Sequence, residues 1–366
     1  MSGPSPTAPQ TYLNLVATVD NFRIGHPTAP QDLAQTEYLV PWALSPGLSS
    51  PIIGLLRPPI VAQLRAENDA TPHIHAKSWH FTMTTTGREQ VSFAPWVDTP
   101  TKRTEVMRKL CEKWRDEGLW SNIIGPGKWR GESYPVYRRP FGKNDAPVEE
   151  TDNDSTNYVF RMERAACALF GTVTYGVHMS VYVYDPRVGY SIWVPKRART
   201  KQTWPGYLDN SVAGGIPAGL SPFESLVKEA MEEASIDEDI VRNYAKGVGS
   251  ISYFFSTNDG WLQPEVEYLY DLCVPSEHAS DARYQPKPLD GEVESFELLP
   301  LEAVKSRMRA GLFKPNCAAA LIDFMIRHGE ITPDNEPDFM EIITRLHGRF
   351  NYDQWSRSTS GIRTAS

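Results

Sequence analysis

Residues 213–236 read AGGIPAGLSPFESLVKEAMEEASI and join a glycine-rich loop to a clearly marked helix. The helix begins at an S-x-x-E capping box, Ser221 to Glu224, and Pro222 occupies its first position. At about 100° per residue, the apolar side chains gather on one face of this helix. They are Phe223, Leu226, Val227, Ala230 and Ala234. The stretch therefore predicts an amphipathic helix that packs against a core.

Three glutamates, Glu229, Glu232 and Glu233, share another face of the same helix. Like charges at positions i and i+4, such as Glu229 and Glu233, destabilise an isolated helix by about 0.2–0.5 kcal/mol unless a cation neutralises them. Carboxylate oxygens suit Mg²⁺ or Mn²⁺, which then bridge to the oxygens of a diphosphate. The preceding glycines allow a loop carbonyl to approach the same ion. Spacing alone leaves two hypotheses open: a metal site, or the solvated acidic face of a surface helix.

The composition of the whole chain limits the classes of partner. The 366 residues carry a formal net charge of −8, which argues against an electrostatic grip on nucleic acid. No apolar run approaches the roughly 18 residues of a membrane helix, and the N-terminus lacks the pattern of a secretory signal. The four cysteines form no CxxC pair, so they are expected to be thiols in a reducing compartment. A cytoplasmic protein with a small-molecule partner is therefore expected, without nucleic acid or membrane.

Strand patterns outnumber helical ones and do not alternate with them, which favours an α+β sandwich over a doubly wound sheet. Strands are expected at 79–93, at 177–185 and 190–198 as a hairpin, and at 251–257, 264–275 and 294–299. Helices are expected at 101–119, 161–170, 300–308 and 316–328. The expected division is a disordered segment 1–10, an N-terminal α+β domain 11–150, a second domain 151–334, and a C-terminal extension and tail 335–366.

Set on Gly214, the opening stretch resembles the Nudix box, G-x5-E-x7-R-E-U-x-E-E-x-G-U, where U is aliphatic. Glu229, Glu232, Glu233 and Ile236 match the box. Three positions depart from it: Leu220 replaces a glutamate, Lys228 the arginine and Ser235 the second glycine. The resemblance implies a Nudix α/β/α sandwich with a mixed sheet, preceded by a smaller α+β domain.

Segments outside the box, among them GVHMSVYVY, QPEVEYLYDL and FKPNCAAALIDFMIRHG, are similar to the Nudix proteins related to thiamine pyrophosphokinase. This resemblance implies a metal-dependent diphosphatase that converts thiamine diphosphate, and its oxo and oxy analogues, to the monophosphate and phosphate. Two alternatives stay open. One is a Nudix hydrolase of a nucleoside diphosphate derivative such as ADP-ribose, and the other is a non-catalytic module that binds a diphosphate.

The resemblance also implies the ligands of Mg²⁺ or Mn²⁺: Glu229, Glu232 and Glu233, with the carbonyl of Gly214. One of the three glutamates would also act as general base in the attack of water on phosphorus. A further carboxylate is expected from a later strand or loop, with Glu265, Glu267, Glu292 and Glu294 as candidates. Strand alternation places Glu265 and Glu267 on one face, and Glu267 is the first choice.

Basic and aromatic residues upstream of the glycine loop are candidates for binding the substrate. Arg197 and Lys201 belong to a basic run that could hold a diphosphate, although a solvated turn explains the run equally well. Trp204 could stack on a thiazolium or pyrimidine ring, or it could serve packing. Lys228 keeps the positive charge of the box arginine without its planar fork. The N-terminal region is assigned to specificity or to the contact of a homodimer.

Overall fold

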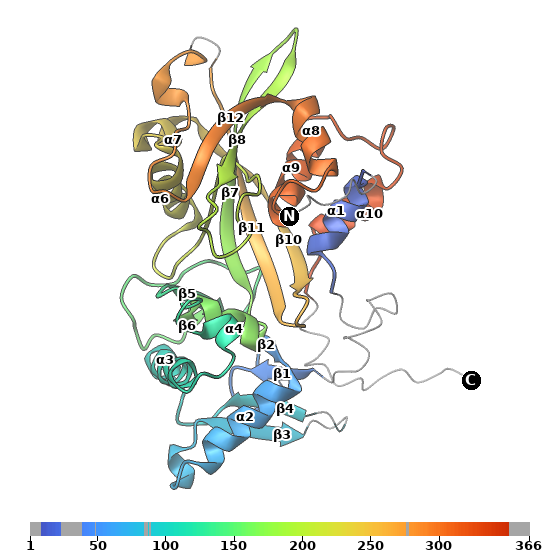
Figure 1. Ribbon diagram of the computed structural model, residues 1–366. Helices are drawn as coiled ribbons and strands as arrows, with labels where there is room; N and C mark the ends of the chain where they lie inside the picture. Colours follow the sequence, from blue (N-terminus) through green and yellow to red (C-terminus); the bar gives the residue numbers. More distant parts are fainter. Residues whose placement is uncertain are drawn as a thin grey trace, which may run out of the picture.

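The computed structural model describes residues 9–22, 39–47, 49–83, 87, 89–275 and 278–350. Most of the segment predicted to be disordered at the N-terminus, and the tail from Trp355, lie outside these residues. Two parts of the chain are stacked along the long axis of the molecule (Figure 1). We call residues 39–170 the N-terminal unit, and residues 171–350 the sandwich.

The N-terminal unit is built on a four-stranded sheet of order β2-β1-β4-β3, in which β1 and β4 are parallel. Its strands are β1 (Val40–Ala43), β2 (Ile52–Leu56), β3 (Trp79–Met83) and β4 (Glu89–Phe93). Its helices are α2 (Pro58–Asp69), α3 (Pro100–Asp116) and α4 (Ser121–Ile124), with a 3₁₀ turn at Ile74–Ala76. Trp42, Phe93, Trp114 and Phe160 are fully buried in its core.

A two-stranded sheet, β5 (Ser133–Tyr137) with β6 (Tyr158–Glu163), lies between the four-stranded sheet and the sandwich (Figure 1). The expected helix at 161–170 is wrong over its first part. Residues 158–163 pair with β5, and only the 3₁₀ turn Arg164–Ala166 and α5 (Cys167–Phe170) are helical. The expected strand at 79–93 is likewise two antiparallel strands, β3 and β4.

The sandwich surrounds a mixed sheet of order β10-β11-β7-β8-β12, with β9 paired to β7. Its strands are β7 (Thr174–Asp185), β8 (Gly189–Arg197), β9 (Val212–Gly215), β10 (Ala245–Ser256), β11 (Leu262–Cys273) and β12 (Val293–Pro300). The β11–β7 pair is parallel and the other pairs are antiparallel. The predicted α+β sandwich with a mixed sheet is confirmed.

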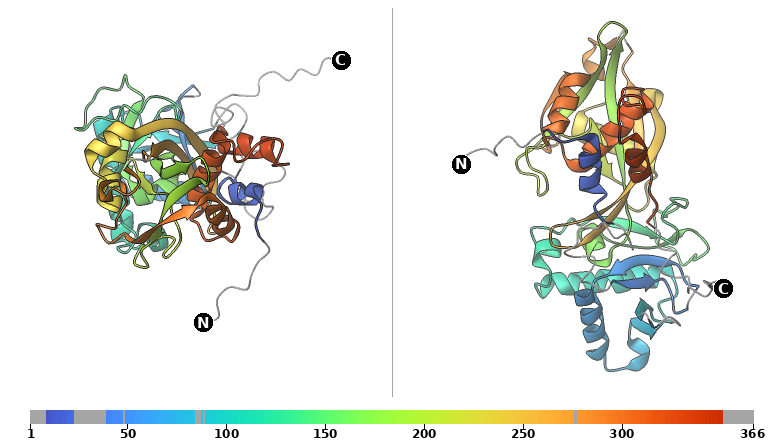
Figure 2. Two further views of the ribbon diagram at one scale, coloured as in Figure 1. Left: turned by 90° about the horizontal axis from the view of Figure 1, so that it is seen from above. Right: turned by 90° about the vertical axis from the view of Figure 1, so that its right-hand side faces the viewer.

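Helices cover both faces of this sheet (Figure 2). On one face lie α6 (Pro222–Ala234) and α7 (Glu238–Tyr244), and on the other α8 (Leu301–Arg309), α9 (Pro315–Arg327) and α10 (Phe339–Leu346). A 3₁₀ turn is present at Ala282–Tyr284. Leu226 and Ala230 of α6 share one buried cluster with Val177 of β7, whereas Phe324 of α9 shares another with Tyr182. Side chains of alternating direction on β7 therefore reach both layers.

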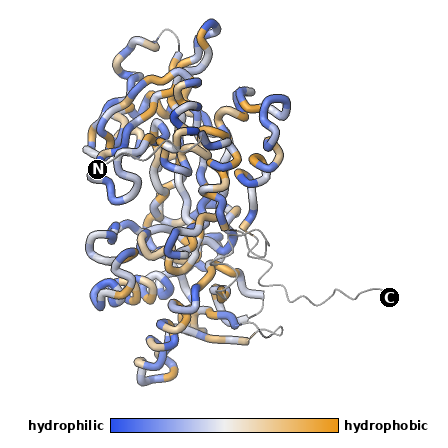
Figure 3. The backbone as a smooth tube through the Cα atoms, turned by 45° about the vertical axis from the view of Figure 1, so that its right-hand side comes forward, coloured by the Kyte–Doolittle hydropathy of each residue, from blue (hydrophilic) through white to orange (hydrophobic). Residues whose placement is uncertain are grey.

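The first helix, α1 (Tyr12–Val19), packs with the sandwich and not with the N-terminal sheet. Tyr12, Leu15, Val16 and Val19 are buried in the cluster that contains Phe324 of α9. Hydrophobic residues recur along the buried strands of both parts (Figure 3). Within the described residues, no helix has the length and apolar character needed to span a membrane.

Candidate active site

Helix α6 is anchored as its sequence indicates. The Ser221 hydroxyl accepts a hydrogen bond from the backbone N–H of Glu224 at 3.2 Å, which caps the helix. The carboxylate of Glu224 does not return to Ser221 but pairs with Arg242 of α7. At the other end, Ser235 adopts the left-handed φ of 53° that favours the box glycine, and its hydroxyl donates to the Lys287 carbonyl.

Strand β9 brings the glycine loop against the glutamates of α6. The Glu229 carboxyl lies against Gly214 so closely that a Cβ at residue 214 would collide with it. The backbone N–H of Ala213 donates to Glu233 Oε2 at 3.4 Å. The predicted neighbours, Gly214 and Glu229, are therefore in contact.

Lys228 lies among the glutamates. Its Nζ is 2.7 Å from Glu232 Oε2 and 3.3 Å from Glu229 Oε1. Glu232 is exposed and Glu229 half-buried, so Lys228 spans the rim of the acidic face. Because its ammonium group pairs with carboxylates of its own helix, Lys228 helps to fix the positions of these glutamates.

Burial changes the protonation of two of the three glutamates. Burial, followed by the charges of Asp209 and Glu229, raises the pKa of Glu233 to about 7. Burial also raises the pKa of Glu229, against the charge of Lys228. A carboxylate held in such surroundings gains more from a divalent cation than one in water, since the cation compensates the lost hydration.

Glu267 of β11 points at the same glycine loop from the floor of the sheet. It is 5 % exposed, and its Oε2 has no hydrogen-bond partner among the described residues. A Cβ at Gly176 of β7 would meet Glu267 Oε2 and would lie 3.0 Å from the Gly214 carbonyl oxygen. Gly176 thus leaves room for two oxygens, one from Glu267 and one from Gly214.

These oxygens fit a hard divalent cation, because an unpartnered buried carboxylate oxygen and a backbone carbonyl are ligands that Mg²⁺ and Mn²⁺ take. Within the described ranges, no three His, Cys, Asp or Glu side chains converge closely enough to form a ready-made metal site. Lys228 pairs with Glu229 and Glu232, while other buried polar groups hold Glu267. Loading an ion therefore requires these side chains to rotate toward it.

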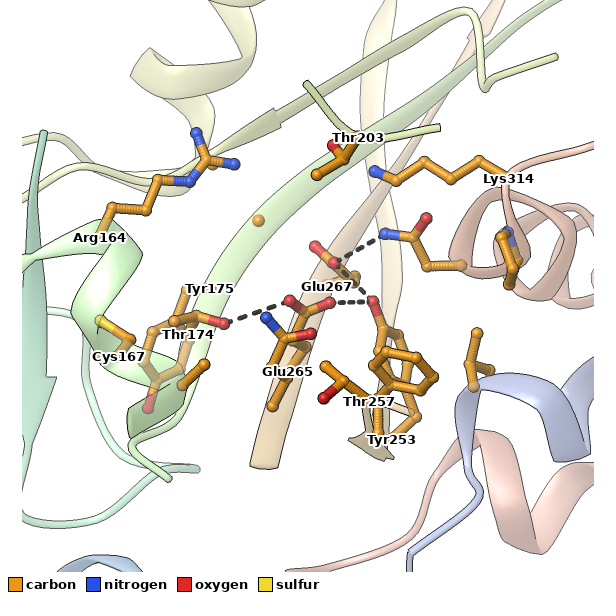
Figure 4. Close-up of a pocket in the computed structure, with 18 of the residues that line it drawn as sticks. Arg164, Cys167, Thr174, Tyr175, Thr203, Tyr253, Thr257, Glu265, Glu267 and Lys314 are labelled. Carbon is orange, nitrogen blue, oxygen red and sulfur yellow. Dashed lines mark hydrogen bonds between the residues drawn. The ribbon is translucent and has the colours of Figure 1, made fainter. Parts of the chain in front are cut away.

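A network of buried polar groups holds Glu267. Tyr253 of β10 donates to Glu267 Oε1 at 2.9 Å and also contacts Glu265, as Figure 4 shows. His178 Nε2 lies 3.6 Å from Glu267 Oε1, and its Nδ1 donates a hydrogen bond to the amide oxygen of Asn210 at 2.7 Å. Burial alone would raise the pKa of Glu267, but the charge of His178 holds it below its ordinary value.

A cavity of about 620 Å³ opens beside this network, where the N-terminal unit meets the sandwich. Glu265, Glu267 and Tyr253 line its floor, and Arg164 and Lys314 lie on opposite sides of it (Figure 4). The glutamates of α6 do not line the cavity, which meets them at Gly214. The cavity has acidic and aromatic walls in its interior and cations at its edges.

The basic and aromatic candidates lie in different places. Arg197 is buried and pairs with Asp209, and its guanidinium also donates to the carbonyls of Thr203 and Trp204 at 3.1 Å. It therefore holds the Trp204 loop from inside. Lys201 lies 3.9 Å from Glu233 and contacts Glu292, whereas Trp204 lines the cavity with its ring 5.0 Å from that of Tyr207.

Four residues of the site carried no sequence signal: Gly176, Tyr253, Lys314 and Arg164. Lys314 comes directly before α9 and forms no hydrogen bond or ion pair through its Nζ in the part of the chain that the structure describes. Nothing in the local spacing of these residues distinguishes them from structural positions. Only the strand order, which brings β7, β10 and β11 together, reveals them.

Comparisons with known proteins agree with this geometry. The model of the NUDIX domain matches residues 174–318, and the model of a domain of unknown function (DUF4743) matches residues 52–174. An uncharacterized protein of Saccharomyces cerevisiae is 39 % identical over 261 residues, which cover 68 % of this chain and 69 % of that protein. Nudix hydrolase 20, chloroplastic, of Arabidopsis thaliana is 37 % identical over 255 residues, 69 % of this chain and 60 % of the plant protein.

Among solved structures, DR0079 of Deinococcus radiodurans aligns with 46 % of this chain and 90 % of its own, at 22 % identity and a TM-score of 0.32. The NUDIX match and the sequence relatives support a hydrolase that acts on phosphorus anhydrides. Residues 174–318 of the chain therefore form a domain of the Nudix family.

Proposed function

We propose that the protein hydrolyses thiamine diphosphate and its oxo and oxy analogues to the monophosphate and inorganic phosphate. The observation that carries this proposal is the cavity beside Gly214. Glu265 and Glu267 give its floor negative charge, and Trp204, Tyr253 and Phe255 supply aromatic walls. A heteroaromatic ring, cationic as in thiazolium, gains from both kinds of wall.

The diphosphate would lie where the cavity meets the glycine loop. There Glu229, Glu232, Glu233 and Glu267, with the Gly214 carbonyl, would hold Mg²⁺ or Mn²⁺. When bound, the metal supplies a water of lowered pKa and neutralises negative charge on the phosphate oxygens. Lys201 and Lys314 reach the same region with positive charge and would orient the anion.

The reaction then requires one proton to be accepted and one leaving group to depart. The water oxygen bonds to the terminal phosphorus, and the bond between that phosphorus and the bridging oxygen breaks. A glutamate of α6 accepts the proton of the water, and the bridging oxygen leaves on the monophosphate. Closing the cavity around the ring excludes bulk water, which strengthens these electrostatic contacts.

One assay tests the proposal: release of inorganic phosphate with Mg²⁺ or Mn²⁺ from thiamine, oxothiamine and oxythiamine diphosphates and from ADP-ribose. The expected result is turnover of the thiamine compounds with phosphate and the monophosphate as products. Turnover of ADP-ribose without any thiamine compound would refute the ring assignment. Binding of these ligands without turnover of any of them would instead make the chain a non-catalytic module.

Two further expectations belong to this proposal. A homodimer is tested by light scattering of the purified chain on a size-exclusion column. A cytoplasmic location is tested by imaging the tagged protein in its own cell, and a plastid signal would overturn it. Two plant relatives, Nudix hydrolases 20 and 24 of Arabidopsis thaliana, are chloroplastic by name.

A further inference from the structure

The residues of the N-terminal unit that line the same cavity as Glu267 include Arg130, Tyr134 and Arg164. All three fall within residues 52–174, the match to the domain of unknown function, and outside the NUDIX match. The cavity is therefore walled by both parts of the chain. Contacts with the glycine loop and with neighbouring groups hold Tyr134 and Arg164, whereas Arg130 is exposed and is fixed through its backbone N–H.

Tyr134 of β5 lies directly against the loop. Its hydroxyl occupies the position that a Cβ on Gly215 would take, and the neighbouring Ser133 carbonyl accepts from the backbone N–H of Ala218 at 2.9 Å. The Tyr134 side chain is buried, and its hydroxyl has no hydrogen-bond partner among the described residues. A buried hydroxyl without a partner is costly, so it indicates a place for a polar ligand.

Arg164 follows β6 and covers the ring of Tyr134, with 5.0 Å between its Cζ and the ring centroid. Its Nη1 donates to Glu132 Oε2 at 3.0 Å, and Figure 4 shows the guanidinium at the edge of the cavity, pointing toward the sandwich. Its charge also acts to lower the pKa of Glu229 and of Glu265 against the effect of burial. Arg164 thus stands close to the acidic groups of the site.

Arg130 brings a second positive charge. In the described part of the chain its guanidinium has no hydrogen bond or ion pair, although it lines the cavity. Burial, and after it the charge of Arg164, lowers the pKa of Arg130. The two guanidinium groups therefore lie near one another, and among the described residues Glu132 is the one carboxylate that forms an ion pair with either of them.

Glu163 fixes the two arginine-bearing segments to each other. It is buried, and its Oε1 accepts from the backbone N–H groups of Arg130 at 2.9 Å and Ala165 at 3.2 Å. Its Oε2 accepts from the N–H of Gly131 at 3.1 Å. The backbone beside each arginine is thereby preorganised, and among the described residues Glu163 forms no ion pair with either guanidinium.

We propose that Arg130, Tyr134 and Arg164 form a cradle for the terminal phosphate of the diphosphate, so that the N-terminal unit completes the Nudix active site. A terminal phosphate carries up to two negative charges and the esterified phosphate one, which matches a cradle of two guanidiniums. A guanidinium group can donate two parallel hydrogen bonds to two oxygens of one phosphate, and the Tyr134 hydroxyl donates a further hydrogen bond. The cradle holds the group that leaves as inorganic phosphate.

This inference rests on the proposed hydrolysis of a diphosphate but not on the identity of the ring. The probe is therefore imidodiphosphate, which lacks a ring and a cleavable P–O–P bridge, titrated calorimetrically into the full chain with Mn²⁺. Arg130→Ala and Tyr134→Phe are expected to weaken its binding by about tenfold each. Arg139→Ala is the matched control, because Arg139 is exposed in the same unit and does not line the cavity.

Thiamine monophosphate provides the second arm of the experiment. Its binding should change less than twofold in Arg130→Ala and Tyr134→Phe, since the cradle holds only the phosphate that it lacks. Imidodiphosphate binding equal to that of the wild type in both variants, or no binding to the wild type, would overturn the cradle. If imidodiphosphate binding depends on Arg130 while no thiamine compound binds, the cradle stands and the ring assignment falls.

Tyr134→Phe keeps the ring that Arg164 covers, so this variant separates a lost hydrogen bond from a lost fold. Its melting temperature should remain within about 3 °C of the wild type, and only ligand affinity should fall. A loss of affinity in Arg130→Ala that is matched by Arg139→Ala would assign the effect to net charge and refute the cradle.

Discussion

Glu267 and Gly176 lie on adjacent parallel strands, and the Glu267 carboxylate occupies the space that a side chain at residue 176 would need. The same space borders the Gly214 carbonyl oxygen. A glycine on a neighbouring strand therefore decides how far the Glu267 carboxylate can reach toward the glycine loop. This contact links β7, β9 and β11 at the point where the metal is expected.

Gly176→Ala should displace Glu267 and weaken Mn²⁺ binding by about 10–100-fold, in the range seen when groups that orient metal ligands are changed. Electron paramagnetic resonance titration of Mn²⁺ measures this directly. Gly247→Ala on β10 is the control, because a Cβ there meets only Tyr270 at an ordinary 3.6 Å. Equal Mn²⁺ affinity in both variants would show that Glu267 does not ligate the metal.

Glu232→Gln should lower kcat by at least about 100-fold and leave the melting temperature within about 2 °C of the wild type. Glu232 is exposed and pairs with Lys228, so its charge contributes little to folding. Glu224→Gln is a matched control on the same helix, since Glu224 is similarly exposed and pairs with Arg242. A kcat for Glu232→Gln equal to that of the control would remove Glu232 from the reaction.

The raised pKa of Glu233 predicts a specific pH dependence of stability when EDTA removes metal ions. Burial raises this pKa from 4.5 to about 7, so the folded protein favours the protonated carboxyl. The stabilisation is complete below pH 4.5 and disappears as the pH rises through about 7. The free energy of unfolding in urea should thus fall over this window, by at most about 3 kcal/mol from this group.

Glu233→Gln supplies the test of that assignment, because glutamine does not titrate. Its free energy of unfolding should vary less with pH than that of the wild type between pH 4.5 and 7. Parallel curves for the two proteins would contradict a Glu233 that is protonated in the folded state.

Arg197→Met should destabilise the protein by about 3 kcal/mol, because it leaves the Asp209 carboxylate buried without its guanidinium partner. Chemical unfolding measures this change. Arg199→Met, in the same basic run but with a side chain 81 % exposed, should change stability by less than about 1 kcal/mol. If Arg197→Met instead kept full stability and raised only KM, Arg197 would be a substrate ligand, as its sequence context suggested.

Local patterns predicted the elements on which the candidate site lies. The capping box located the start of α6 within the sequence, and strand alternation placed Glu265 and Glu267 on one face of β11. Both inferences concern neighbours within a few residues, where backbone geometry determines which side chains share a face. The two strands of the hairpin, β7 and β8, were predictable for the same reason.

Long-range contacts account for what the sequence did not predict. The length of the run at 161–170 suited a helix, but pairing with β5 overrode that local preference in residues 158–163. Arg197 looked like a surface cation until the fold placed Asp209 beside it. Tyr134 and Gly215 are separated along the chain by three strands and several loops, so nothing in their spacing indicated that they touch.

The docking of α1 against α9 has a consequence for synthesis. The N-terminal helix leaves the ribosome first, yet the apolar surface that covers Leu15 and Val16 does not exist until α9, which begins at Pro315, has also emerged. During most of translation α1 must therefore wait with its hydrophobic face uncovered, a state in which chaperones bind nascent chains. Docking of α1 onto α9 therefore comes only after the synthesis of residues 315–327.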